Sequence, residues 1–300
     1  MSELPVSKVE WPTLALLAVT YAVWIVGIGA AAALWLPLGM ILVALSAAQH
    51  SSLCHEALHG HPTRKRWLNE LLVFPQLTLA VPYGRFRDTH LAHHRDENLT
   101  DPYDDPETNY KDPKVWGRYP RWLRAVLRFN NTLAGRMLIG PLIGQVWFMA
   151  DDLRKIRAGD RAVLNAWLVH IPSLALVFAA FAAFGQMPLW AFLLSSYGGL
   201  SLLKIRTYLE HRAHEKSEGR TVIVEDRGLL ALLFLNNNYH VVHHARPGVP
   251  WYRLPRMFRA EREAFLRRNE GYYYRSYREV FSRHLVRAKD PVPHPLWPKE

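Results

Sequence analysis

The sequence predicts an all-α membrane protein: four transmembrane helices in two hairpins, and a cytoplasmic helical cap that carries histidine clusters. No Asp, Glu, Lys or Arg occurs between Trp11 and Cys54, or between Ala162 and Leu203. Each block is about twice the ~20 residues that one helix needs to cross a bilayer. Histidines at helical spacing follow the first block and recur in the polar segments. We therefore expect one membrane domain over residues 1–300.

The four spans are expected at about residues 13–35, 37–54, 163–184 and 188–203, and the cap at residues 55–161 and 204–300. The turns inside the two hairpins carry no charge, whereas every Lys and Arg lies outside the two apolar blocks. By the positive-inside rule, this asymmetry places both termini and the polar segments in the cytoplasm. The first block is too long for a cleaved signal peptide and is followed at once by another span.

Composition limits the classes of function. The formal net charge is +11. Because the Lys and Arg residues lie outside the apolar blocks, we expect them to face a membrane surface and not a nucleic acid. Cys54 is the single cysteine, which excludes an internal disulfide and a cysteine-ligated iron–sulfur cluster. The loop over residues 95–113 is rich in Asp and Pro. Its carboxylates could bind metal, but we expect them to be exposed at the surface.

Three stretches place histidines on one helical face, because positions i, i+3 and i+4 are neighbours on a helix. They have the forms HxxxH, HxxHH and HxxHH. A further histidine, His211, follows the fourth span, just as the pair His55 and His59 follows the second span. The cap thus gathers nine imidazoles that could bind two metal ions: His55, His59, His90, His93, His94, His211, His240, His243 and His244. Imidazole suits iron, copper, zinc and nickel, so the ligand type does not name the metal.

The remaining histidines have simpler interpretations. We expect His50 to be a polar packing residue, and His170, alone on an apolar helix, to be structural. His61 is either an outer support for the first pair or a loop histidine, and His214 has no assigned role.

Two other functions fit part of this pattern. His55, Glu56 and His59 match the HExxH signature of zinc metalloproteases, in which the glutamate is the general base. Such a protease would leave six of the histidines unused, which counts against it. A metal-storage or metal-sensing protein would need a Met-rich or carboxylate-rich entry path, and the sequence has none.

In order and spacing, the histidine motifs resemble those of the integral-membrane fatty acid desaturase and hydroxylase superfamily, of bacterial type, over nearly the whole chain. The resemblance implies a non-haem centre of two iron ions at the cytoplasmic face, which uses O2 and two electrons to oxidise an unactivated C–H bond. The nine histidines fall on the family's motifs, His211 on the loosest one. An asparagine before the last motif contacts a metal through water in some members, and Asn236 is its counterpart.

Carboxylates are expected to orient the imidazole rings from outside the ligand shell. Glu56, Asp88, Asp96 and Glu210 are near enough in sequence to do so.

The resemblance favours desaturation of an acyl chain in a membrane lipid, because the first motif has the three-residue gap of acyl-lipid desaturases. His240, rather than Gln, opens the last motif and argues against front-end desaturases. The alternative is hydroxylation of a lipid chain or headgroup, as in ornithine-lipid hydroxylases. We expect a separate electron donor, a ferredoxin or small haem protein with its reductase, and a location in the bacterial inner membrane.

Substitution separates ligand histidines from structural ones. His94→Ala and His240→Ala should each abolish lipid oxidation without unfolding the membrane helices, because each removes a metal ligand. His170→Ala should have a mild effect. Product formation per amount of monodisperse protein measures this, and equal losses in all three variants would contradict the assignment.

Overall fold

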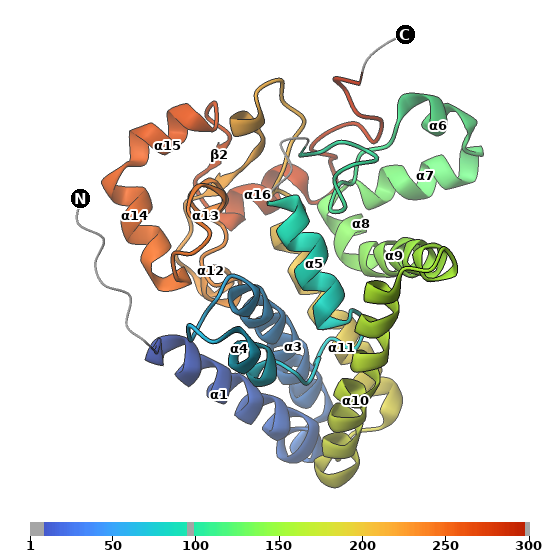
Figure 1. The fold of residues 1–300 in the computed structure, drawn as a ribbon, viewed down its shortest axis with the longest axis vertical. Coiled ribbons are helices and arrows are strands. Elements are labelled where there is room, and N and C mark those ends of the chain that lie inside the picture. The colour runs from blue at the N-terminus through green and yellow to red at the C-terminus, as the bar shows by residue number, and fades with distance from the viewer. Residues whose placement is uncertain (1–8, 95–98, 298–300) are drawn as a thin grey trace. The chain divides into compact units, whose positions relative to one another are not determined.

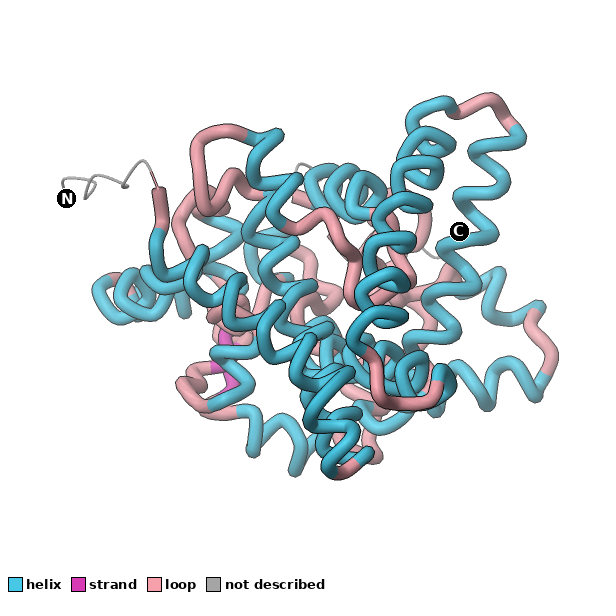
Figure 2. Tube along the Cα trace, turned by 90° about the horizontal axis from the view of Figure 1, so that it is seen from below, coloured by secondary structure: helices cyan, strands magenta, loops and turns pink. Residues whose placement is uncertain are grey.

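The structure is a computed structural model, and it describes residues 9–94 and 99–297. The described chain is mostly helical, with one short pair of strands (Figure 2). It divides into two compact units, each discontinuous in sequence. Unit 1 is Met1–Arg87 with Ala150–Leu200, and unit 2 is Asp88–Met149 with Ser201–Glu300. The chain passes between the units within α5 (Tyr83–His93), α9 (Gly140–Arg157) and α11 (Leu189–Thr207).

Unit 1 is built around long apolar helices. Its elements are α1 (Trp11–Val26), a π-helical turn (Gly27–Ala31), α2 (Ala32–Leu34), α3 (Leu36–Leu58), α4 (Arg66–Leu72) and α10 (Arg161–Phe184), with parts of α5, α9 and α11. Helices α1 and α3 run side by side (Figure 1). Trp35 has an extended backbone between them, and a proline in the first turn of α3 suits the start of a helix. Helical segments therefore cover the first two predicted spans, with ends close to the expected residues.

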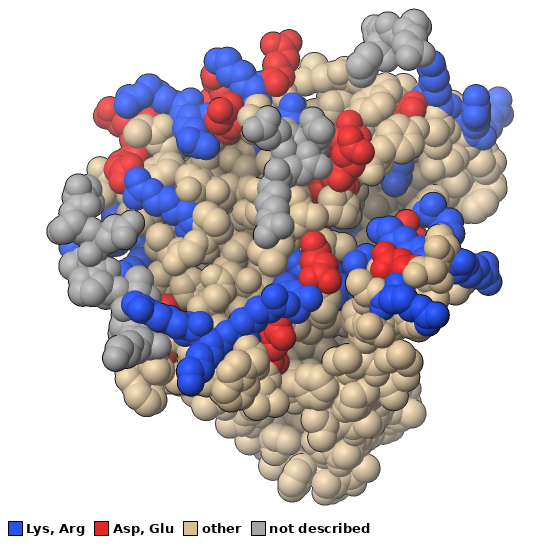
Figure 3. All heavy atoms as spheres, in the orientation of Figure 1, with Lys and Arg blue, Asp and Glu red and all other residues tan. Residues whose placement is uncertain are grey.

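Three helical segments among the described residues are long and apolar enough to cross a bilayer: Trp11–Leu34, Leu36–Leu58 and Arg161–Phe184. They correspond to the first three predicted spans. Helix α11 covers the fourth, but it carries Lys204 and Arg206 near its end and is not among these candidates. The fourth span and the arrangement in two hairpins thus stay predictions. In Figure 3, the lower end of the view, where α1 and α10 end, shows no charged side chain.

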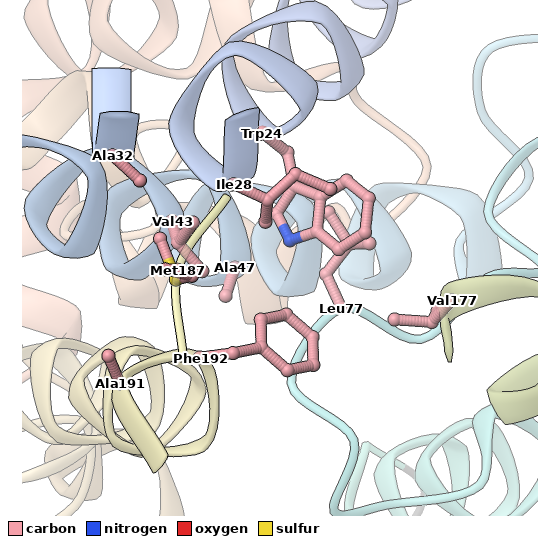
Figure 4. Close-up of a cluster of buried hydrophobic side chains, with 10 residues drawn as sticks. All are labelled: Trp24, Ile28, Ala32, Val43, Ala47, Leu77, Val177, Met187, Ala191 and Phe192. Carbon is pink, nitrogen blue, oxygen red and sulfur yellow. The ribbon is translucent and has the colours of Figure 1, made fainter. Parts of the chain in front are cut away.

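The core of unit 1 joins the N-terminal helices to α10 and α11. Trp24, Ile28 and Val43 pack with Phe192 of α11 (Figure 4). The rings of Phe181 and Phe192 stack with centroids 4.4 Å apart. Helices far apart in sequence are held together by this apolar packing.

Two histidines of unit 1 have hydrogen-bond partners inside the unit. His50 Nε2 lies 3.0 Å from the hydroxyl of Tyr21, and its Nδ1 lies 3.5 Å from Cys54 Sγ. His170 Nε2 lies 3.1 Å from the carbonyl oxygen of Leu79. These contacts fit the packing roles that the sequence suggests for both residues.

Unit 2 consists mainly of short helices. Its elements are α6 (Pro113–Arg118), α7 (Arg121–Asn130), α8 (Leu133–Leu138), β1 (Ile223–Val224), α12 (Leu229–Leu233), α13 (His240–Ala245), α14 (Leu254–Ala260), α15 (Arg262–Arg268), β2 (Tyr273–Tyr274) and α16 (Tyr277–His284), with 3-10 turns at Ser217–Arg220 and Trp251–Arg253. Strands β1 and β2 pair in parallel. Tyr239, Val242, Leu254 and Phe258 form the core where α13 packs on α14 (Figure 1).

A buried ion pair joins α5 to α9 within unit 1. Arg85 donates from Nε and Nη2 to Asp152, with distances of 2.8–3.0 Å. The Trp167 indole donates to the same carboxylate at 2.8 Å, and Asp152 is fully buried. Because the guanidinium is also buried, removing the carboxylate would take away the counter-charge of this buried pair.

We therefore expect Asp152→Ala to lower the free energy of unfolding by about 3–5 kcal/mol. The neighbouring Asp151 makes ion pairs only with the exposed side chains of Arg154 and Lys155, so Asp151→Ala should cost less than about 1 kcal/mol. Thermal unfolding in detergent, followed by tryptophan fluorescence, compares the two variants. Equal shifts would mean that the buried pair contributes no more than the exposed one.

Candidate metal centre

The last turn of α5 places the second histidine motif. His90, His93 and His94 fall at positions i, i+3 and i+4, and the amide of His94 donates to the carbonyl of His90, which continues the helix by one residue. His90 and His93 are 3% and 1% exposed. These two imidazoles are therefore buried and do not face solvent.

The short helix α13 carries the last motif. Leu235 and Asn236, just before it, have φ angles of 50° and 54°, a left-handed conformation that asparagine tolerates better than most residues. This turn directs the chain into α13. The amide of Val241 donates to the carbonyl of Val222, and Val242 is buried in the core of unit 2. One side of the helix is thus fixed in the core while its histidines face the second motif.

Four histidines converge at one point of unit 2. His93, His211, His240 and His244 can each offer one ring nitrogen such that all four lie within 4.8 Å of one another. His211 Nε2 is 2.8 Å from His93 Nε2 and 3.1 Å from His240 Nε2. His240 Nε2 is also 3.1 Å from His244 Nε2.

A second set lies beside the first. His94 Nε2 is 3.0 Å from His90 Nε2 and 3.1 Å from His243 Nε2. The rings of His94 and His244, one from each set, stack with centroids 4.2 Å apart. Unit 2 therefore holds two adjoining groups of imidazole nitrogens.

The outer ring nitrogens fix the tautomers of three rings. His93 Nδ1 lies 2.9 Å from Asp105 Oδ1, and His90 Nδ1 lies 2.8 Å from Glu107 Oε1. His240 Nδ1 lies 3.1 Å from Asn237 Oδ1. Since an oxygen of this kind can only accept, each Nδ1 must donate, and the Nε2 of a neutral ring then presents its lone pair to the centre of the cluster.

This arrangement fits metal ions. Two nitrogens bound to one ion at about 2.1 Å, at angles of about 90–110°, lie about 3.0–3.4 Å apart. The observed Nε2 separations of 2.8–3.1 Å are close to this range. Several lone pairs facing one another at such distances repel unless a cation or a proton lies between them.

Burial favours the neutral form of four of the rings, which is the form that metal binding requires. It lowers the pKa values of His211, His240 and His244 well below that of free imidazole. Burial, with the neighbouring His90, lowers the pKa of His94 to about 3. At His93 burial also acts to lower the pKa, but Glu107 and Asp105 outweigh it and raise the value to about 9. The carboxylates of Glu107 and Asp105 thus favour the protonated form of the His93 ring.

The first histidine motif lies in unit 1, at the end of α3. The rings of His55 and His59 lie 4.9 Å apart between centroids, and His55 is 1% exposed. Glu56 is 3% exposed, with Oε1 4.0 Å from His55 Nδ1. His55 and His59 are four residues apart at the end of α3, and this spacing brings their imidazoles close together.

The model of the family "Fatty acid desaturase" matches residues 30–277. The chain belongs to this family. It is 24% identical to the beta-carotene ketolase of a Paracoccus strain, over 74% of either chain. It is 30% identical to the human sphingolipid delta(4)-desaturase/C4-monooxygenase over 65% of this chain, and covers 54% of that protein's length.

Family membership identifies this desaturase-family protein as an oxidoreductase that acts on lipids. With its three apolar helices, it is an integral membrane protein. Its buried histidine clusters are compatible with non-haem iron.

The expectation that the carboxylates of residues 95–113 are exposed is wrong for two of them. Asp105 is 4% exposed and Glu107 is partly buried, and both hold histidine rings. The amides of Thr100 and Glu107 donate to Asp105, so the loop folds around this carboxylate. A sequence signal existed, because Asp-Pro turns place carboxylates at fixed positions, but it does not show which way they face.

Glu210, one of the carboxylates that the sequence suggests, lies beside His240, with its Oε1 3.8 Å from His240 Nδ1. It also pairs with Arg206 at 2.9 Å and accepts from Asn237 at 3.2 Å. Asp88 is exposed on α5, and Asp96 lies outside the described residues.

Three asparagines, residues 236–238, precede the last motif, and the first two differ in their contacts. The side chain of Asn236 donates to the carbonyl of Trp251 at 3.2 Å, whereas Asn237 contacts His240. The water-mediated role of Asn236 stays a prediction, and Asn237 is a site residue that sequence reasoning missed.

The two histidines with open roles have hydrogen-bond partners within their own units. His61 Nδ1 is 2.6 Å from Glu10 Oε1 within unit 1. His214 Nδ1 lies 3.2 Å from the carbonyl of Lys216 in the loop after α11.

Asp105→Asn should weaken metal retention about 10–100-fold, because an amide cannot replace both acceptor oxygens that hold the His93 ring and its loop. The matched control is Asp104→Asn, one residue away on an exposed side chain, which should retain metal like the unaltered protein. Iron retained after dialysis against a graded series of chelator concentrations measures the difference. Equal retention by the two variants would show that Asp105 does not tune the centre.

Proposed function

We propose that this protein is a di-iron oxidoreductase that desaturates an acyl chain of a membrane lipid, with O2 as co-substrate and electrons from a separate donor. The observation that carries the proposal is the pair of adjoining histidine groups in unit 2. Family membership supplies the class of reaction.

We assign His93, His211, His240 and His244 to one ion. For the second ion we assign His90, His94 and His243, and we propose from their sequence motif that His55 and His59 complete that set. Nine neutral imidazoles leave the positive charge of the ions uncompensated, which favours binding of an oxygen ligand. Iron bound by these residues would supply the activation of O2 and the removal of hydrogen from an unactivated C–H bond.

The protein's own residues hold this site ready. Asp105, Glu107 and Asn237 keep the rings in one tautomer and orientation, as outer partners of metal-binding histidines do. Burial of His90, His93, His240 and His243 at 3% exposure or less keeps bulk water from their rings. The apolar helices of unit 1 supply the kind of surface that accepts an acyl chain.

We further propose that the chain spans the bacterial inner membrane four times, as two hairpins, with its termini and the site in the cytoplasm. The location of all Lys and Arg outside the apolar blocks supports this orientation. A ferredoxin or a small haem protein with its reductase would deliver the electrons. The net charge of +11 favours an acidic donor, whose docking salt would weaken.

Hydroxylation of a lipid chain or headgroup is the second candidate. One relative is named as both a desaturase and a monooxygenase, and the other as a ketolase. Both outcomes follow removal of the same hydrogen, so the position of the chain relative to the metals decides between them.

Lipid mass spectrometry of cells with and without the gene tests the reaction. Desaturation gives acyl chains lighter by two mass units, and hydroxylation gives products heavier by sixteen, with the fragment that carries the change marking chain or headgroup. Metal analysis of the purified protein should give close to two irons per chain. No lipid change together with one zinc and no iron would overturn the proposal and favour the protease.

A further inference from the structure

Three cations of unit 2 lie along one face of α9. Gly140, Gly144 and Trp147 share that face, because positions i, i+4 and i+7 of a helix coincide. A Cβ placed on Gly140 would lie 2.9 Å from Arg136 Cδ, and one on Gly144 would lie 3.8 Å from Lys204 Nζ. The third cation, Lys111, holds its Nζ 5.0 Å from the centre of the Trp147 ring. The cations therefore lie against successive turns of α9. The helix positions that they contact, residues 140, 144 and 147, are about 6 and 4.5 Å apart along the helix axis.

Within the described residues, no carboxylate forms an ion pair with Lys111, Arg136 or Lys204. Arg136 is 5% exposed and donates only to neutral oxygens, the carbonyl of Asn130 and the side chain of Asn131. The acidic groups of this part of the unit have other partners. Glu107 holds His90, Glu210 pairs with Arg206, and Asp290 pairs with Lys289.

Such a row of positive charge is unfavourable in the protein alone. Burial and the neighbouring Arg136 lower the pKa of Lys204 to about 8, and the same two causes lower the pKa of Lys111. The carboxylates of Glu107 and Glu210 act in the opposite direction on the pKa of Lys204 but do not outweigh burial and Arg136. An anion at this face would remove the repulsion between the cations and replace lost hydration.

The other side of α9 indicates what kind of molecule brings the anion. Leu142, Val146 and Met149 lie on the opposite face and are 59%, 60% and 50% exposed. Exposed apolar side chains at this spacing suit a helix that contacts lipid chains. Trp147, at the edge of the cationic face, is 46% exposed, and tryptophan is enriched at the depth of lipid headgroups. The cationic face therefore lies one helix diameter, about 10 Å, from the lipid-facing side.

We propose that Lys111, Arg136 and Lys204 form a binding site for the phosphate of an anionic membrane phospholipid. Basic pockets between helices recognise lipid headgroups in this way, and a guanidinium with two ammonium groups matches the several oxygens of a phosphate. Gly144 is exposed and has no side chain to block the approach to Lys204. The site goes beyond the proposed oxidation and does not depend on it.

Retention of lipid by the purified full-length protein tests the site. The protein in mixed micelles of phosphatidylglycerol and phosphatidylcholine should retain phosphatidylglycerol preferentially, measured by native mass spectrometry. Lys111→Gln and Lys204→Gln should each reduce that preference about fivefold. Lys155→Gln, which removes an exposed lysine of α9 that pairs with Asp151, should leave it unchanged. The proposal is overturned if the three variants behave alike, or if inorganic phosphate at millimolar concentration displaces the lipid.

A second measurement uses the unaltered protein and so does not depend on how the variants fold. Acetylation of lysines, followed by peptide mass spectrometry, should be slowed at Lys111 and Lys204 by phosphatidylglycerol and not by phosphatidylcholine. Lys155 should react equally in both lipids. Unchanged reactivity of Lys111 and Lys204 in phosphatidylglycerol would also overturn the proposal.

Discussion

The hydrogen bonds from the Nδ1 atoms of His90, His93 and His240 are the constraint on which the site of unit 2 depends. Each bond ends on an acceptor oxygen, of Glu107, Asp105 or Asn237, so each ring in its neutral form directs the lone pair of Nε2 to the interior. Without these partners the buried rings could turn or change tautomer. With them, two groups of nitrogens face each other at distances suited to metal ions.

The rest of unit 2 maintains this constraint. The loop before α6 folds around Asp105 through the amides of Thr100 and Glu107. Helix α13 has only six residues, too few to be stable by itself, and the core around Tyr239, Val242 and Leu254 holds it in place. Short helices suffice here because tertiary packing, not helix propensity, fixes the direction of the histidines.

The contrast between the packing histidines and the clustered histidines has a simple physical basis. His50 and His170 lie in apolar helices and bond to groups of the same unit, a hydroxyl and thiol for one and a carbonyl for the other. The clustered rings instead face other imidazole nitrogens. A ring nitrogen that meets a hydrogen-bond partner needs nothing more, whereas a set of converging lone pairs needs a cation.

The sequence by itself determined the features that depend on local spacing. Charge-free blocks marked the apolar helices, and the i, i+3, i+4 spacing marked His90, His93 and His94 and placed them on one helical face. These signals are local because helix periodicity and hydrophobic length act over a few turns. The family resemblance, carried by the same motifs, was confirmed.

Only the tertiary structure decided which residues surround the histidines. It selected Asp105 and Glu107 from a loop expected at the surface, placed Asn237 rather than Asn236 against His240, and joined His211 to rings from two other motifs. It also aligned Lys111, Arg136 and Lys204 along α9. These contacts join residues from 3 to more than 100 positions apart, and they depend on the path of each loop and on one-residue differences in direction. No periodic pattern in the sequence encodes such a path, because it results from the packing of the whole unit.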